Sequence, residues 1–229
     1  MKIRTTFFAL LILATISLPK ISQAQYRAFV LGIKAAPSIS WLKTDEKTYN
    51  SEGVKPGFSW GLATEIYFAK NYAFTTGFNF TYQGGKLSYP DIISGDVVSL
   101  TRNYRIRYLE FPAVLKLKTN EMGLFRYYGQ IGLGFGVRIN SKGKDEYKDG
   151  VNLISEPYAD IDKYTRLFKA SMILGGGIEY PFDKNTALIL GVNFNNGFTN
   201  ALKGDNVVNS TYQHSGKPNF VELNIGIMF

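Results

Sequence analysis

The sequence predicts an all-β fold: an eight-stranded antiparallel up-and-down transmembrane β-barrel with short periplasmic turns and long extracellular loops. Three observations predict it. The last ten residues alternate strictly between apolar and polar or small side chains, eight segments share this alternation, and the links between them alternate between short and long. Successive strand residues point to opposite faces, so this alternation fits lipid outside the barrel and a polar lumen inside.

The first 24 residues form a predicted signal peptide. Lys2 and Arg4 precede an apolar run from Phe7 to Leu18, and the small residues Ser22 and Ala24 frame a cleavage site. The run of about a dozen residues is shorter than the roughly twenty that a membrane-anchoring helix needs. We therefore expect export, cleavage after Ala24 and one mature domain, residues 25–229, located in the outer membrane of a Gram-negative cell.

Composition narrows the function classes. The formal net charge of +8 falls to +5 when the three cations of the predicted signal peptide are removed, and the remaining cations are dispersed, which argues against a nucleic-acid partner. The chain has no cysteine, which excludes a lipoprotein anchor and thiolate metal sites. After residue 24 no apolar run is long enough for a spanning helix, so membrane insertion must use strands.

The eight strands are expected, in chain order, near residues 26–36, 57–69, 72–84, 102–118, 123–140, 164–181, 185–197 and 217–229. Short turns are expected at 69–71, 118–122 and 181–185, and long polar loops near 37–56, 85–101, 141–163 and 198–216. Both termini then lie at the short-turn end, which is the periplasmic end in barrels of this class.

The lumen is predicted to hold an ionic network of both signs. An unpaired buried charge is unfavourable, so inward cations and carboxylates should pair with one another or bind water. Glu110 is expected to pair with a lumen cation, such as Arg126 on the neighbouring strand. The inward charged residues are Lys34, Glu65, Glu110, Lys116, Arg126, Arg138, Lys169, Glu179 and Glu222. A gated ion path is the alternative, and the narrow interior of an eight-stranded barrel argues against it.

Aromatic residues are expected to form girdles at the two membrane boundaries, although β-propensity alone could also place them in strands. The final residue, Phe229, is the expected C-terminal insertion signal for the barrel-insertion machinery. The periplasmic girdle is predicted to contain Tyr26, Tyr72, Tyr180 and Phe229, and the external one Phe58, Trp60, Tyr82 and Phe198.

The segment Tyr108–Lys118 reads YLEFPAVLKLK and resembles the Y-L-E-[IF]-P-x-x-L-K motif of the PorT-like outer-membrane β-barrel proteins of Bacteroidota. The segments 175–180 (GGGIEY) and 191–197 (GVNFNNG) resemble a later hairpin of that family. The resemblance covers essentially the whole mature chain. It implies an outer-membrane barrel, usually without enzymatic activity, and PorT itself is associated with type IX secretion. Because proline cannot donate to a sheet ladder, Pro112 of the motif predicts a bulge in the fourth strand.

Three outward arginines are expected just above the apolar band on the external side: Arg105, Arg107 and Arg166. Guanidinium groups bind phosphate bidentately, so these residues are candidates for contact with lipopolysaccharide phosphates. The alternative is that strands extend past the membrane and the side chains are solvated.

A histidine and an acidic loop are two further candidate sites in the sequence. The only histidine, His214, is the sole candidate base for a lipid-modifying enzyme, but we expect a solvent-exposed loop residue because a nucleophile and an orienting group are lacking. The acidic loop Ser141–Lys163 does not have the spacing of a calcium loop, so solvated charge is expected and no metal or cofactor is predicted.

The predicted function is that of a non-enzymatic envelope-structural or interaction protein, with an accessory role in secretion, or a surface partner, left open. Its partners are outer-membrane lipid and lipopolysaccharide. The alternative function is lipid modification using His214. A lipocalin-like ligand carrier would need an apolar lumen and a polar exterior, which is the inverse of the observed alternation.

Overall fold

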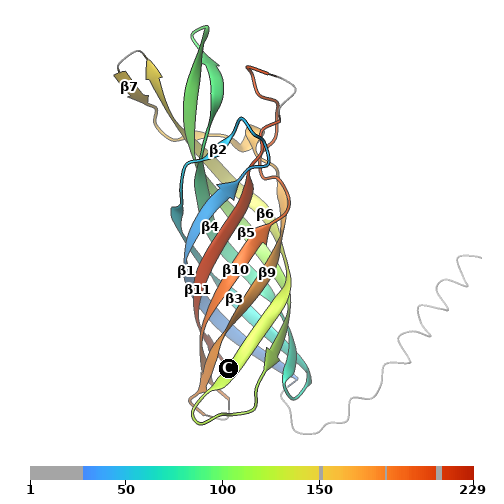
Figure 1. The fold of residues 1–229 in the computed structure, drawn as a ribbon. Helices are drawn as coiled ribbons and strands as arrows, with labels where there is room; N and C mark the ends of the chain where they lie inside the picture. The colour runs from blue at the N-terminus through green and yellow to red at the C-terminus, as the bar shows by residue number, and fades with distance from the viewer. Residues whose placement is uncertain (1–27, 150–151, 184, 210–212) are drawn as a thin grey trace, which may run out of the picture.

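The structure is a computed structural model that describes residues 28–149, 152–183, 185–209 and 213–229. The predicted signal peptide and Tyr26 lie outside these residues. Eight antiparallel strands form a closed ring, in which β1 pairs with β11 and β4 pairs with β5 (Figure 1). In ring order they are β1 (Phe29–Lys43), β3 (Lys55–Ala69), β4 (Tyr72–Ile93), β5 (Asp96–Lys118), β6 (Arg126–Asp149), β9 (Phe168–Pro181), β10 (Ala187–Gly197) and β11 (Lys217–Met228).

Several short elements lie at the external end of the ring. They are β2 (Asn50–Ser51), β7 (Asn152–Ser155), β8 (Ala159–Asp160) and the 3-10 helix η1 (Asp162–Tyr164). Within the described part of the chain, no helix has the length and apolar character needed to cross a membrane. The predicted eight-stranded antiparallel barrel is therefore confirmed.

The external connections differ from the prediction. Instead of a long loop over 85–101, β4 and β5 continue to a tight turn at Ser94-Gly95. Both residues have positive φ angles, 56° and 96°, as the common two-residue hairpin turn requires. In the predicted loop over 141–163, β6 continues to Asp149 and pairs with β7. Two hairpins consequently project beyond the barrel (Figure 1), and the expected strict alternation of short and long links is wrong.

A bulge lies on β6 near the external end of the barrel. Arg107 pairs with Asn140, but the next residue, Tyr108, pairs with Arg138, so β6 carries one extra residue. A one-residue shift exchanges the two faces of a strand. Beyond the bulge, Ser141 is therefore buried inside while Lys142 points outward.

The bulge predicted at Pro112 is wrong. Pro112 pairs with Gly134 on β6 without any change of register. On the β4 side the register is also the same before and after the proline, although the paired residues skip from Thr75–Val114 to Asn79–Glu110. The missing proline N–H thus interrupts the ladder locally instead of adding a residue.

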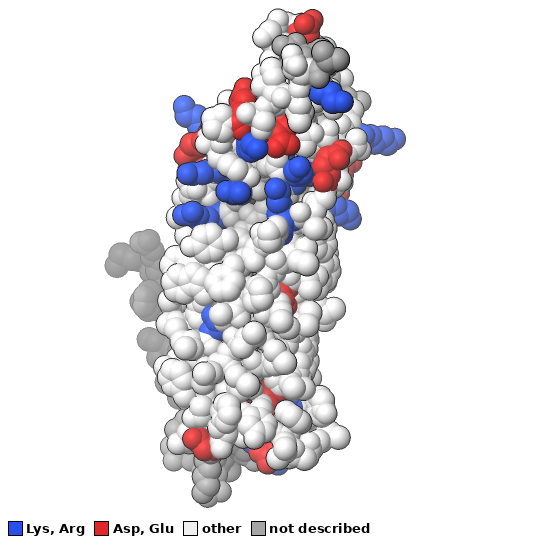
Figure 2. Space-filling view, turned by 90° about the vertical axis from the view of Figure 1, so that its left-hand side faces the viewer, with Lys and Arg blue, Asp and Glu red and all other residues white. Residues whose placement is uncertain are grey.

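The outer and inner faces have opposite character. Large apolar side chains point outward along the barrel, for example Trp60 (46% exposed), Phe135 (47%) and Leu190 (41%). Polar side chains such as Ser59 and Asn193 point inward and are buried. Figure 2 shows that the middle of the barrel surface is almost free of charge. This arrangement is the inverse of a soluble ligand carrier and matches strands surrounded by lipid.

The predicted girdle residues lie mostly on the outer face. Tyr72, Phe58, Trp60, Tyr82, Phe198 and Phe229 are exposed. Tyr180 is only partly exposed because it packs against Phe125 and Phe182, with ring centroids 5.7 and 5.2 Å away. The backbone of Phe229 is joined to Leu31 by two hydrogen bonds of 2.7 and 3.0 Å, so the last residue closes the ring at the short-turn end.

Candidate functional site

The lumen of the barrel contains a buried cluster of two lysines and two glutamates near the short-turn end. Lys116 Nζ lies 2.5 Å from Glu65 Oε1 and 2.6 Å from Glu179 Oε1. Lys118 Nζ contacts the same two carboxylates at 2.9 and 2.8 Å. The four side chains come from β3, β5 and β9, and we call them the lower charge cluster. Each side chain is less than 10% exposed, so each charge depends on the others for compensation.

Two tyrosines contact the lower charge cluster. The Tyr67 hydroxyl donates to Glu65. The Tyr128 ring lies 4.2 Å from Lys116 Nζ, in the geometry of a cation–π contact. The Tyr128 hydroxyl reaches Gly191 on β10, where an added Cβ would lie only 2.0 Å from its oxygen. The glycines of neighbouring strands therefore provide the space that this ring occupies.

A second set of charges fills the lumen nearer the external end. Lys169 pairs with Glu110, and its ammonium lies 4.6 Å from the Tyr108 ring and 5.1 Å from the Phe220 ring. Between the two levels, Glu222 accepts a 3.0 Å hydrogen bond from Asn193 and lies 3.8 Å from Lys34 Nζ. Asn193 in turn accepts a 2.6 Å hydrogen bond from Gln130, so amide side chains surround this carboxylate.

The structure places the nine predicted lumen charges in three locations. Arg126 lies at the short-turn rim, partly exposed, and pairs with Glu121. Arg138 lies at the external end and pairs with Asp162. Glu110 pairs with a lumen cation as expected, but the cation is Lys169 and not Arg126, because Glu110 lies at the level of Lys169 in the outer half. The other charges lie inside the barrel: Lys34, Glu65, Glu110, Lys116, Lys169, Glu179 and Glu222.

Lys118 was not among the predicted lumen residues, although it lies in the lower charge cluster. Its position could have been found from the sequence, since it shares the inward parity of Glu110 and Lys116 on the same strand. It is the first residue of the predicted turn 118–122, where strand parity is a weak guide, and only the three-dimensional register brings it to Glu179.

The free space in the lumen is small. A cavity of about 80 Å³ lies in the middle of the barrel and is lined both by apolar residues such as Val114 and Ile173 and by polar ones such as Asn79, Asn195 and Glu222. A wider vestibule of about 740 Å³ lies at the short-turn end, lined by Lys118, Glu121, Arg126 and Asn185 among others. The lower charge cluster lies between these two spaces and lines both of them.

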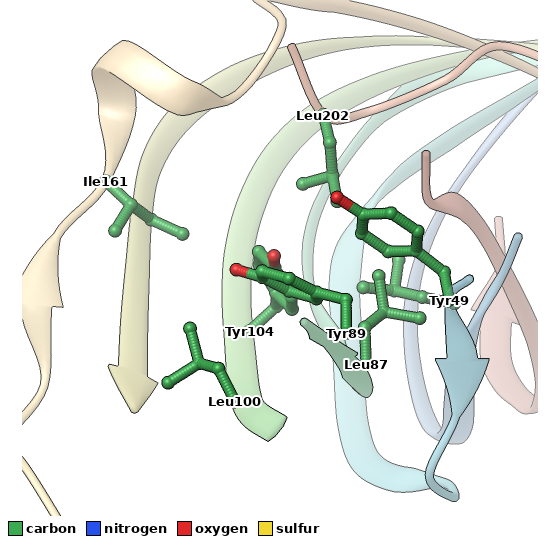
Figure 3. Close-up of a cluster of buried hydrophobic side chains, with 8 residues drawn as sticks. Tyr49, Leu87, Tyr89, Leu100, Tyr104, Ile161 and Leu202 are labelled. Atoms are coloured by element: carbon green, nitrogen blue, oxygen red, sulfur yellow. The ribbon is translucent and has the colours of Figure 1, made fainter. Parts of the chain in front are cut away.

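The external end of the lumen is covered by a packed hydrophobic cluster, which we call the external cap (Figure 3). Tyr49 and Tyr89 stack with ring centroids 4.7 Å apart. Complete burial raises the pKa of Tyr104 to about 12, so its hydroxyl is neutral at physiological pH. The external cap consists of Leu42, Tyr49, Leu87, Tyr89, Leu100, Tyr104, Ile161 and Leu202.

His214 packs against the external cap. Its Nδ1 lies 2.8 Å from the Tyr49 hydroxyl, and its ring lies 5.4 Å from that of Tyr89. The prediction of a solvent-exposed loop residue is therefore wrong: the loop folds back, and the side chain is half-buried. Burial, followed by the positive charge of Arg102, lowers the pKa of His214 and favours the neutral imidazole. Among the described residues, the ring makes no hydrogen bond to a serine or threonine hydroxyl.

Carboxylates of the predicted acidic loop pair with strand cations. Asp145 forms a bidentate pair with Arg102, with both oxygen–nitrogen distances at 2.5 Å. Glu146 lies 3.1 Å from Lys144, and Asp162 pairs with Arg138. Within the described residues, no group of three or more histidine, cysteine, aspartate or glutamate side chains could hold a metal ion.

The three predicted external arginines are all exposed. The Arg105 guanidinium lies 4.0 Å from the ring centroid of Tyr158, and that of Arg107 lies 5.2 Å from Tyr82. Arg166 donates through Nε to the carbonyl oxygen of Leu202 at 3.1 Å. Arg105 and Arg107 follow one another on the outer face of β5, whereas Arg166 precedes β9 and is tied to the last external loop.

The fold and its filled lumen define an integral outer-membrane barrel. The chain belongs to the outer membrane protein beta-barrel domain family, whose model matches residues 21–203, and it is accordingly a protein of the Gram-negative outer membrane. No curated protein sequence matches it.

Solved structures with a similar arrangement include Neisserial surface protein A, with 12% identity, coverage of 88% of this chain and 96% of that chain, and a TM-score of 0.43. The attachment invasion locus protein Ail of Yersinia pestis has 15% identity, coverage of 88% and 97%, and a TM-score of 0.36. The outer membrane protease OmpT of Escherichia coli has 10% identity, coverage of 91% and 99%, and a TM-score of 0.36.

Proposed function

We propose that the protein is a non-enzymatic, non-conducting barrel that acts as an envelope-structural or interaction component through its external surface. The observation that carries this proposal is the obstruction of the lumen at three levels. The lower charge cluster, the layer around Lys169 and the external cap each place packed side chains across the interior. An eight-stranded barrel has room only for such side chains, so ions lack a wet path.

The non-enzymatic part of the proposal is supported by the surroundings of His214. A histidine base needs a nucleophile in hydrogen-bond reach, and here its Nδ1 faces the Tyr49 hydroxyl inside a packed cluster. The burial of Tyr49 raises the pKa of this hydroxyl, which disfavours the phenolate. The contact therefore fits an anchor that holds the last external loop over the lumen.

The closed lumen is tested by conductance. The purified protein, inserted into a planar lipid bilayer, is expected to give no stable conductance steps, because paired charges and aromatic rings occupy the interior. A sixteen-stranded porin inserted in the same way serves as the positive control, and heat-modifiable migration on a gel verifies that the barrel is folded. Reproducible ohmic steps from the folded protein would contradict the proposal.

A narrower proposal is an accessory role in protein secretion, as in PorT. It is supported by the motif Tyr108–Lys118, which supplies four buried inward residues: Tyr108, Glu110, Val114 and Lys116. These residues serve the interior of the barrel, so the motif itself describes how the lumen is filled. The secretion role therefore needs a test in the cell.

That test is a clean deletion of the gene in the parent strain, followed by comparison of proteins in the medium and on the cell surface. For a secretion component, we expect loss of many secreted proteins and their retention in the periplasm, with recovery on complementation. An unchanged set of secreted proteins would reject the secretion role and leave the envelope-structural role in place.

A further inference from the structure

Five cations form a patch on the outer face of the barrel, where β4, β5 and β6 pass into the two projecting hairpins. We call it the basic belt, and it consists of Lys86, Arg105, Arg107, Lys142 and Lys144. The strand register places them side by side: Lys86 and Lys144 flank Asn103 in one row, and Arg105 pairs directly with Lys142 in the next. Adjacent strands lie only about 4.8 Å apart, so these charges are close neighbours.

The β6 bulge brings the two lysines of β6 into the basic belt. Without the extra residue before Ser141, the inward parity of Arg138 would continue to Lys142 and Lys144 and direct both lysines into the lumen. The bulge reverses the faces, so both lysines emerge beside the arginines of β5. Without knowledge of this bulge, the alternation of the sequence places only the arginines, and neither lysine of β6, on the outer face at this level.

The charges of the basic belt are incompletely compensated. Glu146 lies 3.1 Å from Lys144 and 3.8 Å from Lys86. Among the described residues, no carboxylate lies within ion-pair distance of Arg105, Arg107 or Lys142, although Asp160 on β8 is the register partner of Lys142. Cations held this close repel one another, and an external anion would relieve that repulsion. Aromatic rings of Tyr158 and Tyr82 lie beneath the two guanidinium groups and help to orient them.

The position of the basic belt relative to the apolar band of the barrel indicates which kind of anion it meets. Below Arg107, the same outer face continues with Leu109 and the exposed Phe111, and its neighbour Tyr82 belongs to the external aromatic girdle. Figure 2 shows cations gathered directly above the uncharged band of the barrel surface. In a membrane, this level is that of the headgroups of the outer leaflet.

We propose that the basic belt binds the phosphate groups of lipopolysaccharide in the outer leaflet. Arg105 and Arg107 supply planar donor pairs that match phosphate oxygens, while Lys142 adds a point charge beside them. The acyl chains of the lipid would lie along the apolar face below. This inference goes beyond the proposed function and is independent of conductance and secretion.

The test measures binding of diphosphoryl lipid A to the full mature protein in nanodiscs. The variant Arg105→Gln/Arg107→Gln/Lys142→Gln removes the three belt cations that form no ion pair with a described carboxylate. We expect at least a tenfold loss of affinity for diphosphoryl lipid A and only weak binding of dephosphorylated lipid A by the unmodified protein. The control Lys47→Gln/Lys163→Gln/Lys203→Gln removes the same charge from exposed sites outside the belt and should bind as the unmodified protein does.

The single variant Lys142→Gln provides a milder change, with an expected partial loss, should the triple variant fold poorly. Equal affinity of all folded variants for diphosphoryl lipid A would overturn the proposal, as would equal affinity of the unmodified protein for dephosphorylated lipid A. A soluble sulfated oligosaccharide serves as a second probe. Loss of its binding in the triple variant, with lipid A binding unchanged, would also overturn the proposal and assign the belt to a soluble polyanion.

Discussion

The substitution Lys116→Ala is expected to destabilise the folded barrel strongly. Lys116 contacts two carboxylates inside the lumen, and its removal leaves Glu65 and Glu179 with Lys118 as the remaining lysine of the cluster. Breaking a buried ion pair from one side typically costs about 3–5 kcal/mol, because an uncompensated buried charge remains. Urea unfolding in lipid vesicles, followed by the fluorescence of Trp41 and Trp60, measures the loss.

Two further variants separate charge imbalance from loss of packing. Lys116→Met keeps much of the side-chain volume, so a loss of stability similar to that of Lys116→Ala would identify the carboxylates as the cause. Adding Glu179→Gln to Lys116→Met removes one unbalanced charge and should restore part of the stability. The exposed residue Lys203 offers a matched control, since Lys203→Met should leave the unfolding midpoint unchanged. Full stability of folded Lys116→Ala would contradict the structural role of the lower charge cluster.

The barrel could be predicted from the sequence because its principal signal, alternation with period two, is local. The strand parity of Glu65, Lys116 and Glu179 is visible in the chain, and parity alone places these residues inside. Their pairing depends on the stagger between strands that are distant in sequence, and alternation does not encode it. Glu110 pairs with Lys169 and not with the suggested Arg126 for this reason: Glu110 and Arg126 both point inward on neighbouring strands but lie at different heights.

The external end was harder to predict, because polar composition conceals its strands. Segments 85–101 and 141–163 contain the turn and polar residues that usually mark loops, yet both form hairpins that project beyond the apolar band of the barrel. The β6 bulge also interrupts the alternation, which hides the outward lysines of the basic belt. The burial of His214 could not be predicted, because its contact with Tyr49 joins two loops separated by most of the chain.

Gly191→Ala is the second change expected to have a large effect. An added Cβ at this position would lie 2.0 Å from the Tyr128 hydroxyl oxygen and 2.8 Å from the carbonyl oxygen of Gly176. The Tyr128 ring is buried beside Lys116, so it cannot move away without disturbing the lower charge cluster. Overpacking of this kind typically costs about 1–3 kcal/mol. The measurement is the same urea unfolding transition in lipid vesicles.

The chain offers both a rescue and a control for this prediction. Tyr128→Phe removes the nearest atom that the new methyl group meets, so Gly191→Ala/Tyr128→Phe should recover part of the stability lost in the single variant, while the 2.8 Å contact with the Gly176 carbonyl remains. Gly129→Ala makes the same chemical change on the outer face, where no atom lies within 4 Å of the added Cβ, and should be neutral. If Gly191→Ala is as stable as Gly129→Ala, the lumen at Tyr128 is less tightly filled than the structure indicates, and the case for a non-conducting barrel weakens with it.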